Sequence, residues 1–287
     1  MRIGDIKNKF HLELRGIYED REIKSLFRAL AEEYLELSAA ALLIHADEEL
    51  LDKQKDQFND ALIRLKEHVP VQYIVGHTTF MDCKLKVGPG VLIPRPETEE
   101  MTSMLIKDFQ DPSETLRIID VGTGSACIPI ALSKHLDNVE LIAIEQSKEA
   151  LSYARVNAGL NNADISFHQV NFFDESSLSK LGKFNIIISN PPYVTWSEAD
   201  LMRKNVLEHE PQKALFVEDK FPLIFYQQII RFSLKHLAEN GYIYLEINEK
   251  FGNEILKLFS ENAYSNVNLY KDLSGKDRFI KVRKPAL

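Results

Sequence analysis

The first 70 residues carry a hydrophobic pattern with the period of an α-helix. Between Arg21 and Leu51, apolar side chains recur at intervals of about three or four positions. This stripe contains Ile23, Leu26, Phe27, Leu30, Ala31, Tyr34 and Leu35. A second helical pattern runs from Phe58 to Leu65 and stops before Pro70. The pattern therefore predicts a small helical bundle over residues 1–70.

The pattern changes after Pro70 into short β-like pieces separated by glycines. These pieces are Val71–Val75, Phe80, Lys84–Val87 and Val91–Ile93. We interpret residues 71–94 as a β-hairpin that links two domains. Pro94 and Pro96 disfavour helix at the positions before them, so Glu97 or Thr98 is expected to begin the next helix.

From Leu116 onward, strand-like segments alternate with helical ones. The candidate strands are residues 117–121, 140–144, 165–170, 185–189, 242–247, 266–271 and 278–282. Such alternation is typical of right-handed βαβ crossovers, so residues 95–287 are expected to form an α/β domain with a mainly parallel sheet. A short link containing Gly275 joins the last two strands, which should therefore pair antiparallel at one edge.

Composition narrows the classes of protein to consider. The chain has 287 residues, of which 45% are hydrophobic, yet no apolar run approaches the length of a membrane span. The polar start of the sequence lacks the apolar core of a secretory signal. Two cysteines, Cys83 and Cys127, are too few for a disulfide framework or a cysteine-based zinc site. We therefore expect a soluble, cytosolic protein without a metal site.

The charge balance argues against a protein whose main task is to hold nucleic acid. The net charge is −8, from 35 Lys and Arg against 43 Asp and Glu. Residues 1–70 contain 11 basic and 15 acidic side chains, which gives −4 for the predicted bundle. We expect no direct contact with nucleic acid and no membrane binding.

A glycine turn marks the first candidate site. The buried strand Ile118–Val121 runs into Gly122, Thr123, Gly124, Ser125 and Ala126, where small residues let a ligand approach the backbone. The turn lacks the GKS or GKT continuation of a phosphate-binding loop, which disfavours an ATPase. The next strand ends about twenty residues later in Glu145, whose carboxylate can accept hydrogen bonds from both hydroxyls of a ribose. Together these features predict a nucleoside-bearing cofactor, either a nicotinamide dinucleotide or S-adenosylmethionine.

The third strand of this series ends at Asn171 and Phe172. A polar side chain followed by an aromatic ring can hydrogen-bond to a flat base and cover its face. Phe172 is equally compatible with a place in the hydrophobic core.

The fourth strand ends in Asn190-Pro191-Pro192-Tyr193. Proline offers a carbonyl acceptor, no amide donor and a fixed φ, and Asn190 adds a side-chain carbonyl. Two rigid acceptors side by side suit a planar NH2 group, whose nitrogen is a poor nucleophile because its lone pair is delocalised. Acceptors on both N–H bonds can orient that nitrogen towards an electrophile, while the Tyr193 ring stacks on the planar group. The motif predicts catalysis by positioning.

In combination, these residues resemble the HemK/PrmC family of S-adenosylmethionine-dependent protein methyltransferases, which modify a glutamine amide of class I peptide chain release factors. The resemblance extends over nearly the whole chain. It is carried by Pro70–Gly76, Val91–Glu99, the glycine turn, Asn190–Tyr193, Glu210–Leu215 and Asp272–Arg278.

The resemblance implies a Rossmann-like class I methyltransferase domain with a seven-stranded sheet, preceded by a helical domain that helps to hold the release factor. It implies that S-adenosylmethionine lies against Gly122, Thr123, Gly124, Ser125, Ala126, Glu145, Phe172 and Asn190. It also implies that Asn190, Pro191, Pro192 and Tyr193 bind the glutamine and carry the catalysis.

Three positions depart from the family pattern. Ala126 stands where a third glycine is usual, Glu145 where Asp is usual, and Asn171-Phe172 where an acid and often a tryptophan occur. Glutamate keeps the ribose-binding carboxylate but extends it by one methylene, and alanine is expected to add a methyl near the path of the ligand. We expect altered cofactor affinity with activity retained.

Three alternatives remain at this point. An N6-adenine nucleic-acid methyltransferase also acts on a conjugated NH2, but it would need a basic region to hold a flipped base, which the acidic bundle does not supply. A glutamine methyltransferase acting on a ribosomal protein would share the motifs around the amide. A methyltransferase fold kept only as a binding module depends on Ala126 alone, and intact Asn190–Tyr193 disfavours it.

Overall fold

The computed structural model describes residues 1–110, 114–262, 264 and 266–286. The chain divides into two compact units. The first comprises Met1–His77 together with Arg203–His209, and the second comprises Thr78–Met202 and Glu210–Leu287. Within the described ranges, every helix is too short or too polar to cross a membrane.

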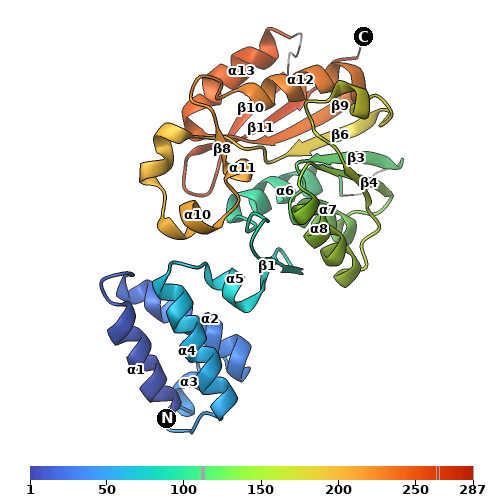
Figure 1. Ribbon diagram of the computed structural model, residues 1–287. Helices are drawn as coiled ribbons and strands as arrows, with labels where there is room; N and C mark the ends of the chain where they lie inside the picture. The colour runs from blue at the N-terminus through green and yellow to red at the C-terminus, as the bar shows by residue number, and fades with distance from the viewer. Residues whose placement is uncertain (111–113, 263, 265, 287) are drawn as a thin grey trace. The chain divides into compact units, whose positions relative to one another are not determined.

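The first unit is a helical bundle, as predicted (Figure 1). Its helices are α1 (Ile3–Leu14), α2 (Asp20–Leu35), α3 (Ala41–Ile44), α4 (Asp52–Lys66), α5 (Val71–Val75) and α10 (Lys204–His209). The Phe27 and Phe58 rings stack with centroids 5.6 Å apart, and Phe10 packs edge-on against Phe27 at 5.4 Å. Aromatic packing of this kind adds to the burial of apolar area that holds the helices together.

The prediction of a strand over Val71–Val75 is wrong, because these residues form helix α5. Pro70 precedes the helix, and Gly76 ends it at φ 81°, a conformation that glycine adopts without strain. Val71, Ile74 and Val75 are spaced as on one helix face and pack against the core of the bundle. Burial of that face outweighs the β preference of its branched side chains.

A segment distant in sequence completes the first unit. Arg203, just before α10, pairs with Glu22 on α2 through an Nη1–Oε1 distance of 2.9 Å. At the end of α10, His209 Nε2 donates to the Glu67 carbonyl at 2.7 Å. These long-range contacts have no counterpart in the local hydrophobic pattern.

The second unit is built on the predicted seven-stranded sheet, with the order β10-β11-β9-β6-β3-β4-β5. Its strands are β3 (Leu116–Val121), β4 (Val139–Glu145), β5 (Ser166–Gln169), β6 (Phe184–Ser189), β9 (Leu237–Glu246), β10 (Asn266–Lys271) and β11 (Asp277–Arg283). Strands β9, β6, β3, β4 and β5 are parallel. β11 pairs antiparallel with both β9 and β10, so the predicted antiparallel pair at one edge is confirmed.

Alternate residues of the central strands enter two hydrophobic cores. Ile118 and Ile186 belong to one core and Ile119 and Ile187 to the other, as the two-residue period of a strand requires. Figure 1 shows α6 (Pro96–Asp108), α7 (Cys127–His135) and α8 (Lys148–Leu160) on one side of the sheet. Helices α12 (Ile224–His236) and α13 (Gly252–Ser260) cover the other side.

Short elements complete the second unit. They are the paired strands β1 (His77–Phe80) and β2 (Cys83–Lys86), helix α9 (Glu175–Leu178), the parallel pair β7 (Val194–Thr195) and β8 (Phe216–Val217), helix α11 (Gln212–Leu215), and the 3-10 helices η1 (Trp196–Leu201) and η2 (Glu249–Phe251). The expected hairpin is therefore present in β1–β2, whereas Val91–Ile93 is not a strand. Helix α6 begins one residue earlier than expected, because Pro96 occupies its first turn, where a missing N–H costs nothing.

Candidate active site

The glycine turn lies at the carboxyl end of β3 and has the backbone conformation that its glycines allow. Gly122 and Gly124 have φ values of 77° and 55°. The N–H groups of Gly122 and Thr123 both donate to the Ile144 carbonyl on β4, at 2.9 and 3.1 Å. A Cβ added at either glycine would meet no heavy atom within 4 Å. The turn thus presents backbone to open space beside the sheet edge, as a cofactor cradle requires.

Ala126 adopts the same left-handed conformation at φ 64° and precedes α7. Its side chain is fully buried, at 0% exposure, in the core between the sheet and α6–α8. The methyl fills core space, and its expected effect on the cofactor stays a prediction. The cost of alanine here is backbone strain of about 1–2 kcal/mol relative to glycine.

Glu145 ends β4 and holds the glycine turn in place. Its Oε2 accepts from Gly124 N at 3.0 Å, and its Oε1 accepts from Ser147 N at 2.8 Å. Each carboxylate oxygen has a second lone-pair site, so the group can still accept from a ligand's hydroxyls. Glutamate is one methylene longer than aspartate, and the Glu145 carboxylate reaches from the end of β4 to Gly124 in the glycine turn after β3.

Asp120, which the sequence reasoning did not single out, lies directly before the turn. The residue is 2% exposed, and among the described residues neither of its carboxylate oxygens nor the Thr123 hydroxyl has a hydrogen-bond partner. Burial raises the pKa of Asp120 to about 7. A carboxyl group among the apolar residues Ile118, Ile119 and Val121, two positions before Gly122, is the signal that could have identified it. An unpaired buried carboxyl fits a cationic group, and the cofactor implied by the resemblance carries an ammonium.

The two phenylalanines that follow β5 differ in burial. Phe172 is 7% exposed, lies in the core on the α12 side, and packs against Phe232 with a centroid distance of 5.5 Å. Asn171 Oδ1 accepts from Phe173 N at 3.0 Å and so shapes the turn. Phe173 is the exposed aromatic side chain at this point, at 42%. Of the two readings left open for Phe172, its packing favours the core.

The Asn190 end of β6 is tied to both the sheet and α6. Ser189 Oγ donates to the Val121 carbonyl at 2.7 Å, which joins this strand end to that of β3. Asn190 Nδ2 donates to Thr98 Oγ1 on α6 at 2.9 Å. Within the described part of the chain, no donor contacts Asn190 Oδ1 or the Pro191 carbonyl. They are acceptors of the kind that the motif predicts, and their role towards an NH2 group stays a prediction.

Glu246 at the end of β9 links α6 to Tyr193. Its Oε2 accepts from Thr98 Oγ1 at 2.7 Å, and its Oε1 accepts from Tyr193 OH at 2.8 Å. Burial raises the pKa of Glu246, while both hydroxyl donors and the Arg278 charge favour its ionised form. Burial and the Glu246 charge raise the pKa of Tyr193 well above its ordinary value, so this phenol keeps its proton. Neither Thr98 nor Glu246 was identified as a site residue from the sequence.

The backbone of Tyr193 is also fixed. Its N–H donates to the Leu215 carbonyl at 3.2 Å, and its carbonyl accepts from Asn248 Nδ2 at 3.2 Å. Asn248 in turn donates to Glu198 Oε2 at 2.9 Å. Although burial opposes ionisation, hydrogen bonds from Lys250, Thr195 and Asn248 hold the pKa of Glu198 at about 2. The Asn190–Tyr193 turn is thus rigid on both sides.

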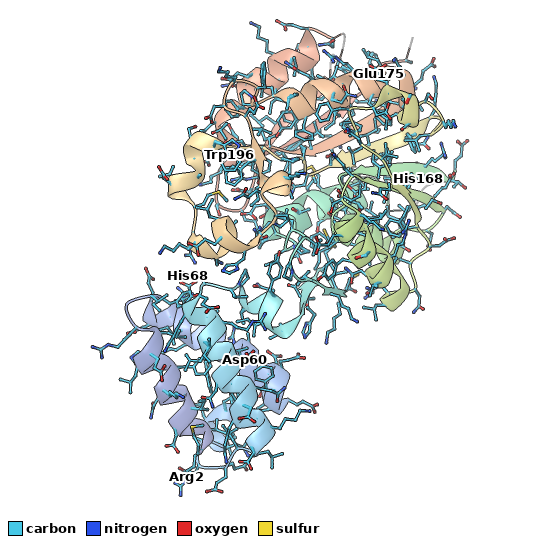
Figure 2. The ribbon with its side chains drawn as sticks, viewed as in Figure 1. Arg2, Asp60, His68, His168, Glu175 and Trp196 are labelled. Atoms are coloured by element: carbon cyan, nitrogen blue, oxygen red, sulfur yellow. The ribbon has the colours of Figure 1, made fainter. Side chains whose placement is uncertain are left out.

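Aromatic packing supports the segment that follows. Trp196, labelled in Figure 2, stacks on Phe216 with centroids 4.2 Å apart and planes 9° from parallel. This stack reinforces the β7–β8 pair directly after the turn.

Arg95 has a structural role, as expected for a proline-flanked segment. Its Nη2 pairs with Glu210 Oε1 at 2.6 Å, and Glu210 Oε2 accepts from Ile93 N at 3.0 Å. Glu210 is buried, so the pair joins the segment before α6 to the Glu210–Leu215 motif.

Comparison with known proteins identifies the same two parts of the chain. Residues 84–216 match the family described as "Methyltransferase small domain", and residues 8–76 match the "PrmC N-terminal domain". The fold is similar to that of a methyltransferase from Pyrococcus furiosus, which has 18% identity and a TM-score of 0.52 over 82% of this chain and 100% of that one.

Two curated relatives match over most of their length. The "Release factor glutamine methyltransferase" of Flavobacterium psychrophilum is 41% identical over 98% of this chain and 99% of its own. The protein of the same name from Bacteroides thetaiotaomicron is 36% identical over 93% and 95%. A class I methyltransferase domain takes its methyl group from S-adenosylmethionine, which is therefore the methyl donor here. By fold, site and full-length similarity, this chain belongs to the release factor glutamine methyltransferase family.

Proposed function

We propose that this protein transfers a methyl group from S-adenosylmethionine to the side-chain amide nitrogen of a glutamine in peptide chain release factors. The observation that carries the proposal is the pair of free acceptors, Asn190 Oδ1 and the Pro191 carbonyl, at the carboxyl end of β6. A glutamine NH2 has two N–H bonds to donate, one to each acceptor. Full-length relatives named for this activity give independent support.

The acceptors act on the glutamine amide by fixing its orientation. With both N–H bonds held, the nitrogen can become pyramidal and direct its lone pair at the methyl donor, and the acceptors stabilise the positive charge that develops there. In this proposal the Tyr193 ring covers the face of the amide, and the hydrogen bonds that anchor its hydroxyl and backbone support that role. Pro192 contributes the fixed φ that keeps the turn rigid.

The cofactor, when bound, supplies an electrophilic methyl group. We assign its contacts to the Gly122–Ala126 backbone, to Glu145 for the ribose hydroxyls, and to Asn190. Asp120, buried without a partner, is the group suited to the ammonium of the methionine portion. Phe172 remains in this assignment as a wall of the cofactor site, held by its edge-type contact with Phe232.

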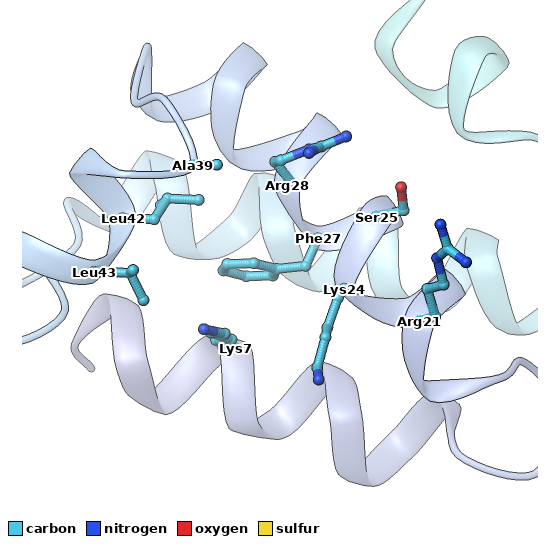
Figure 3. A pocket seen from close by; sticks show the side chains of 9 residues that line it. All are labelled: Lys7, Arg21, Lys24, Ser25, Phe27, Arg28, Ala39, Leu42 and Leu43. Carbon is cyan, nitrogen blue, oxygen red and sulfur yellow. The ribbon is translucent and has the colours of Figure 1, made fainter.

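We further propose that the helical domain over residues 1–70 recognises the release factor. Its support is a cavity of about 380 Å³ inside the first unit. Figure 3 shows the Phe27 ring directed towards Leu42 and Leu43, with Lys7 and Arg28 on opposite sides of it. The cavity lining consists of Lys7, Arg21, Lys24, Ser25, Phe27, Arg28, Ala39, Leu42 and Leu43.

The charge at this cavity contrasts with the acidic bundle around it. Among the described residues, Lys7, Arg21, Lys24 and Arg28 have no recorded ion-pair partner. Unpaired cations around an apolar floor suit an acidic protein segment that also offers an apolar side chain. Lys24→Glu with Arg28→Glu should raise KM for the intact release factor by about tenfold and leave a short acceptor peptide unaffected. Lys53→Glu, a charge reversal at another exposed position of the bundle outside the cavity, is the control for each single reversal.

The test of the proposed function is methyl transfer from labelled S-adenosylmethionine to release factor, ribosomal protein, DNA and RNA in parallel, with Asn190→Ala as control. We expect label on the release-factor glutamine that the variant does not incorporate. Label on the ribosomal protein alone would move the activity to that partner, and label on nucleic acid alone would identify an adenine methyltransferase. Absence of label in every arm would support a binding module.

We infer that the protein acts in the cytoplasm, because that is where bacterial release factors are translated and work. We expect neither nucleic acid nor membrane as a partner.

A further inference from the structure

A chain of buried and partly buried hydrogen bonds links Asn190 and Tyr193 of the acceptor turn through Thr98 and Glu246. Asn190 Nδ2 donates to Thr98 Oγ1 at 2.9 Å, and Thr98 Oγ1 donates to Glu246 Oε2 at 2.7 Å. Tyr193 OH donates to the other oxygen, Oε1, at 2.8 Å. Thr98 is 3% exposed and Glu246 is 1% exposed, so solvent does not complete these bonds.

In the ionised form of Glu246, which its two hydroxyl donors and the Arg278 charge favour against burial, counting protons fixes the direction of every bond in this chain. A carboxylate has no proton to give, so both hydroxyls that contact Glu246 must donate to it. A threonine hydroxyl has a single proton, and Thr98 uses it in the hydrogen bond that it donates to Glu246. Towards Asn190, the Thr98 oxygen can therefore only accept. The end of the Asn190 amide that faces Thr98 must be the NH2 end.

The orientation of the amide matters because its two ends have opposite hydrogen-bonding character. With Nδ2 held by Thr98, Oδ1 is the end left free for a ligand. A rotation of half a turn about the last side-chain bond would exchange these ends with little change in shape. The NH2 of Asn190 would then face the NH2 of the acceptor amide, and two donors would oppose each other.

We propose that Thr98 and Glu246 are positioning residues: they keep the NH2 end of the Asn190 amide towards Thr98, and so keep Oδ1 directed at the acceptor nitrogen. Neither contacts the reacting atoms; they act through Asn190, and Glu246 also holds Tyr193. This proposal rests on the proposed function only in that the acceptor is an NH2 group.

The chain offers a matched pair of threonines to test it. Thr98 and Thr102 both lie on α6, both are buried, and both carry one side-chain hydrogen bond as donor. The Thr102 hydroxyl donates only to the Thr98 backbone carbonyl, at 2.8 Å. Replacing either with valine removes a hydroxyl of the same size from the same helix. Only Thr98→Val removes the acceptor that Asn190 needs.

The measurement is kcat and KM for the methyl acceptor, together with the midpoint of thermal unfolding and the calorimetric Kd for S-adenosylmethionine. Thr98→Val should lower kcat on the order of 10- to 100-fold, because it leaves both the Asn190 NH2 and Glu246 Oε2 without their partner and the amide free to turn. Thr102→Val removes a hydroxyl that donates only to a helix carbonyl, so it should shift the unfolding midpoint by a smaller amount and leave kcat within about twofold. Thr98→Ser, which restores the hydroxyl, should recover most of the activity.

A second variant tests the other end of the chain. Glu246→Gln keeps the shape of the side chain but can accept from only one of the two hydroxyls, so the direction of the bonds is no longer fixed. It should lower kcat as Thr98→Val does, and the two together should cost little more than either alone, because they act through the same amide.

Equal losses of kcat in Thr98→Val and Thr102→Val would overturn the proposal, as would a folded Glu246→Gln enzyme with unchanged kcat. A failure of the proposed function is distinguishable from a failure of this proposal, because the first is measured as the methyl acceptor of the wild type and the second as the ratio of kcat between variant and wild type. If the wild type methylates another NH2-bearing acceptor, the same ratios of kcat are measured on that acceptor.

Discussion

The carboxyl ends of β3 and β6 are neighbours in the sheet, yet the polar side chains at the two ends differ in whether they have hydrogen-bond partners. At the end of β3, Asp120 and Thr123 are buried without a hydrogen-bond partner in the described part of the chain. At the end of β6, the NH2 of Asn190 and the hydroxyls of Thr98 and Tyr193 are all paired, and in the described part of the chain Asn190 Oδ1 and the Pro191 carbonyl accept no hydrogen bond. The first end is incomplete until a ligand binds, whereas the second is already organised.

The difference reflects what each end must do. Binding a charged cofactor gains free energy when the ligand supplies the counter-charge that the protein withholds. Catalysis by positioning requires groups that are already oriented before the substrate binds. The acceptor turn meets this requirement through the hydrogen bonds of Asn190 to Thr98 and of Tyr193 to Glu246, Leu215 and Asn248. Variants at the two ends should therefore fail in different measurements.

The largest effect is expected at the organised end. Asn190→Ala removes one of the two acceptors and should lower kcat by on the order of 10²- to 10³-fold, as the loss of one preorganised polar group does in other enzymes. Single-turnover methyl transfer to the acceptor measures it. A loss confined to KM would mean that Asn190 serves only to bind the substrate.

A loss of affinity is expected at the incomplete end. Asp120→Asn keeps the shape of the side chain but removes the charge offered to the ammonium, so the Kd for S-adenosylmethionine should rise about 10- to 100-fold. Isothermal titration gives the value, with the exposed Asp137→Asn as control. Once the cofactor is saturating, kcat should return close to that of the wild type; a persistent loss of kcat would place Asp120 in the chemistry.

The same carboxyl should make the cofactor-free protein less stable as pH rises. The pKa of Asp120 is raised from 3.8 to about 7, so between these values the folded state holds a proton that the unfolded state has released. The free energy of unfolding therefore falls across this window, by about 4 kcal/mol at most, since one pKa unit corresponds to about 1.4 kcal/mol.

Urea unfolding of the wild type and Asp120→Asn from pH 4 to pH 8 isolates this contribution, because the buried Glu246 is common to both. The wild type should lose stability relative to the variant as pH rises towards 7 and change little beyond it. A constant difference across the series would show that Asp120 stays ionised in the folded protein.

The smallest effect is expected at Ala126. Replacing it with glycine relieves the left-handed strain of about 1–2 kcal/mol but removes a methyl whose burial contributes about 1 kcal/mol. The two nearly cancel, so the free energy of unfolding should change by less than about 1 kcal/mol. The Kd for S-adenosylmethionine should stay the same, because the methyl lies in the core. A change in Kd would return this methyl to the path of the ligand.

Much of the fold follows from local pattern. The strands of the sheet were predictable because they are mostly apolar segments flanked by turn residues, and the antiparallel edge was predictable from the short link that joins its two strands. The helical nature of the first unit was predictable from the helical period of its apolar residues. Helix α5 was not, because its branched residues favour strand and only the surface that they bury makes them helical. The association of Arg203–His209 with the first unit has no local signal at all.

The site divides in the same way. The sequence by itself determined the glycine turn, the acid-tipped second strand and the paired acceptors of Asn190–Tyr193, because parallel strands bring their carboxyl ends to one edge of the sheet. Only the tertiary structure decided which residues serve them. Thr98 and Glu246 are 148 positions apart, and Asp120 is distinguished by burial that leaves both of its carboxylate oxygens without a partner among the described residues. Hydrogen-bond partners and burial are properties of packing, which a local pattern does not encode.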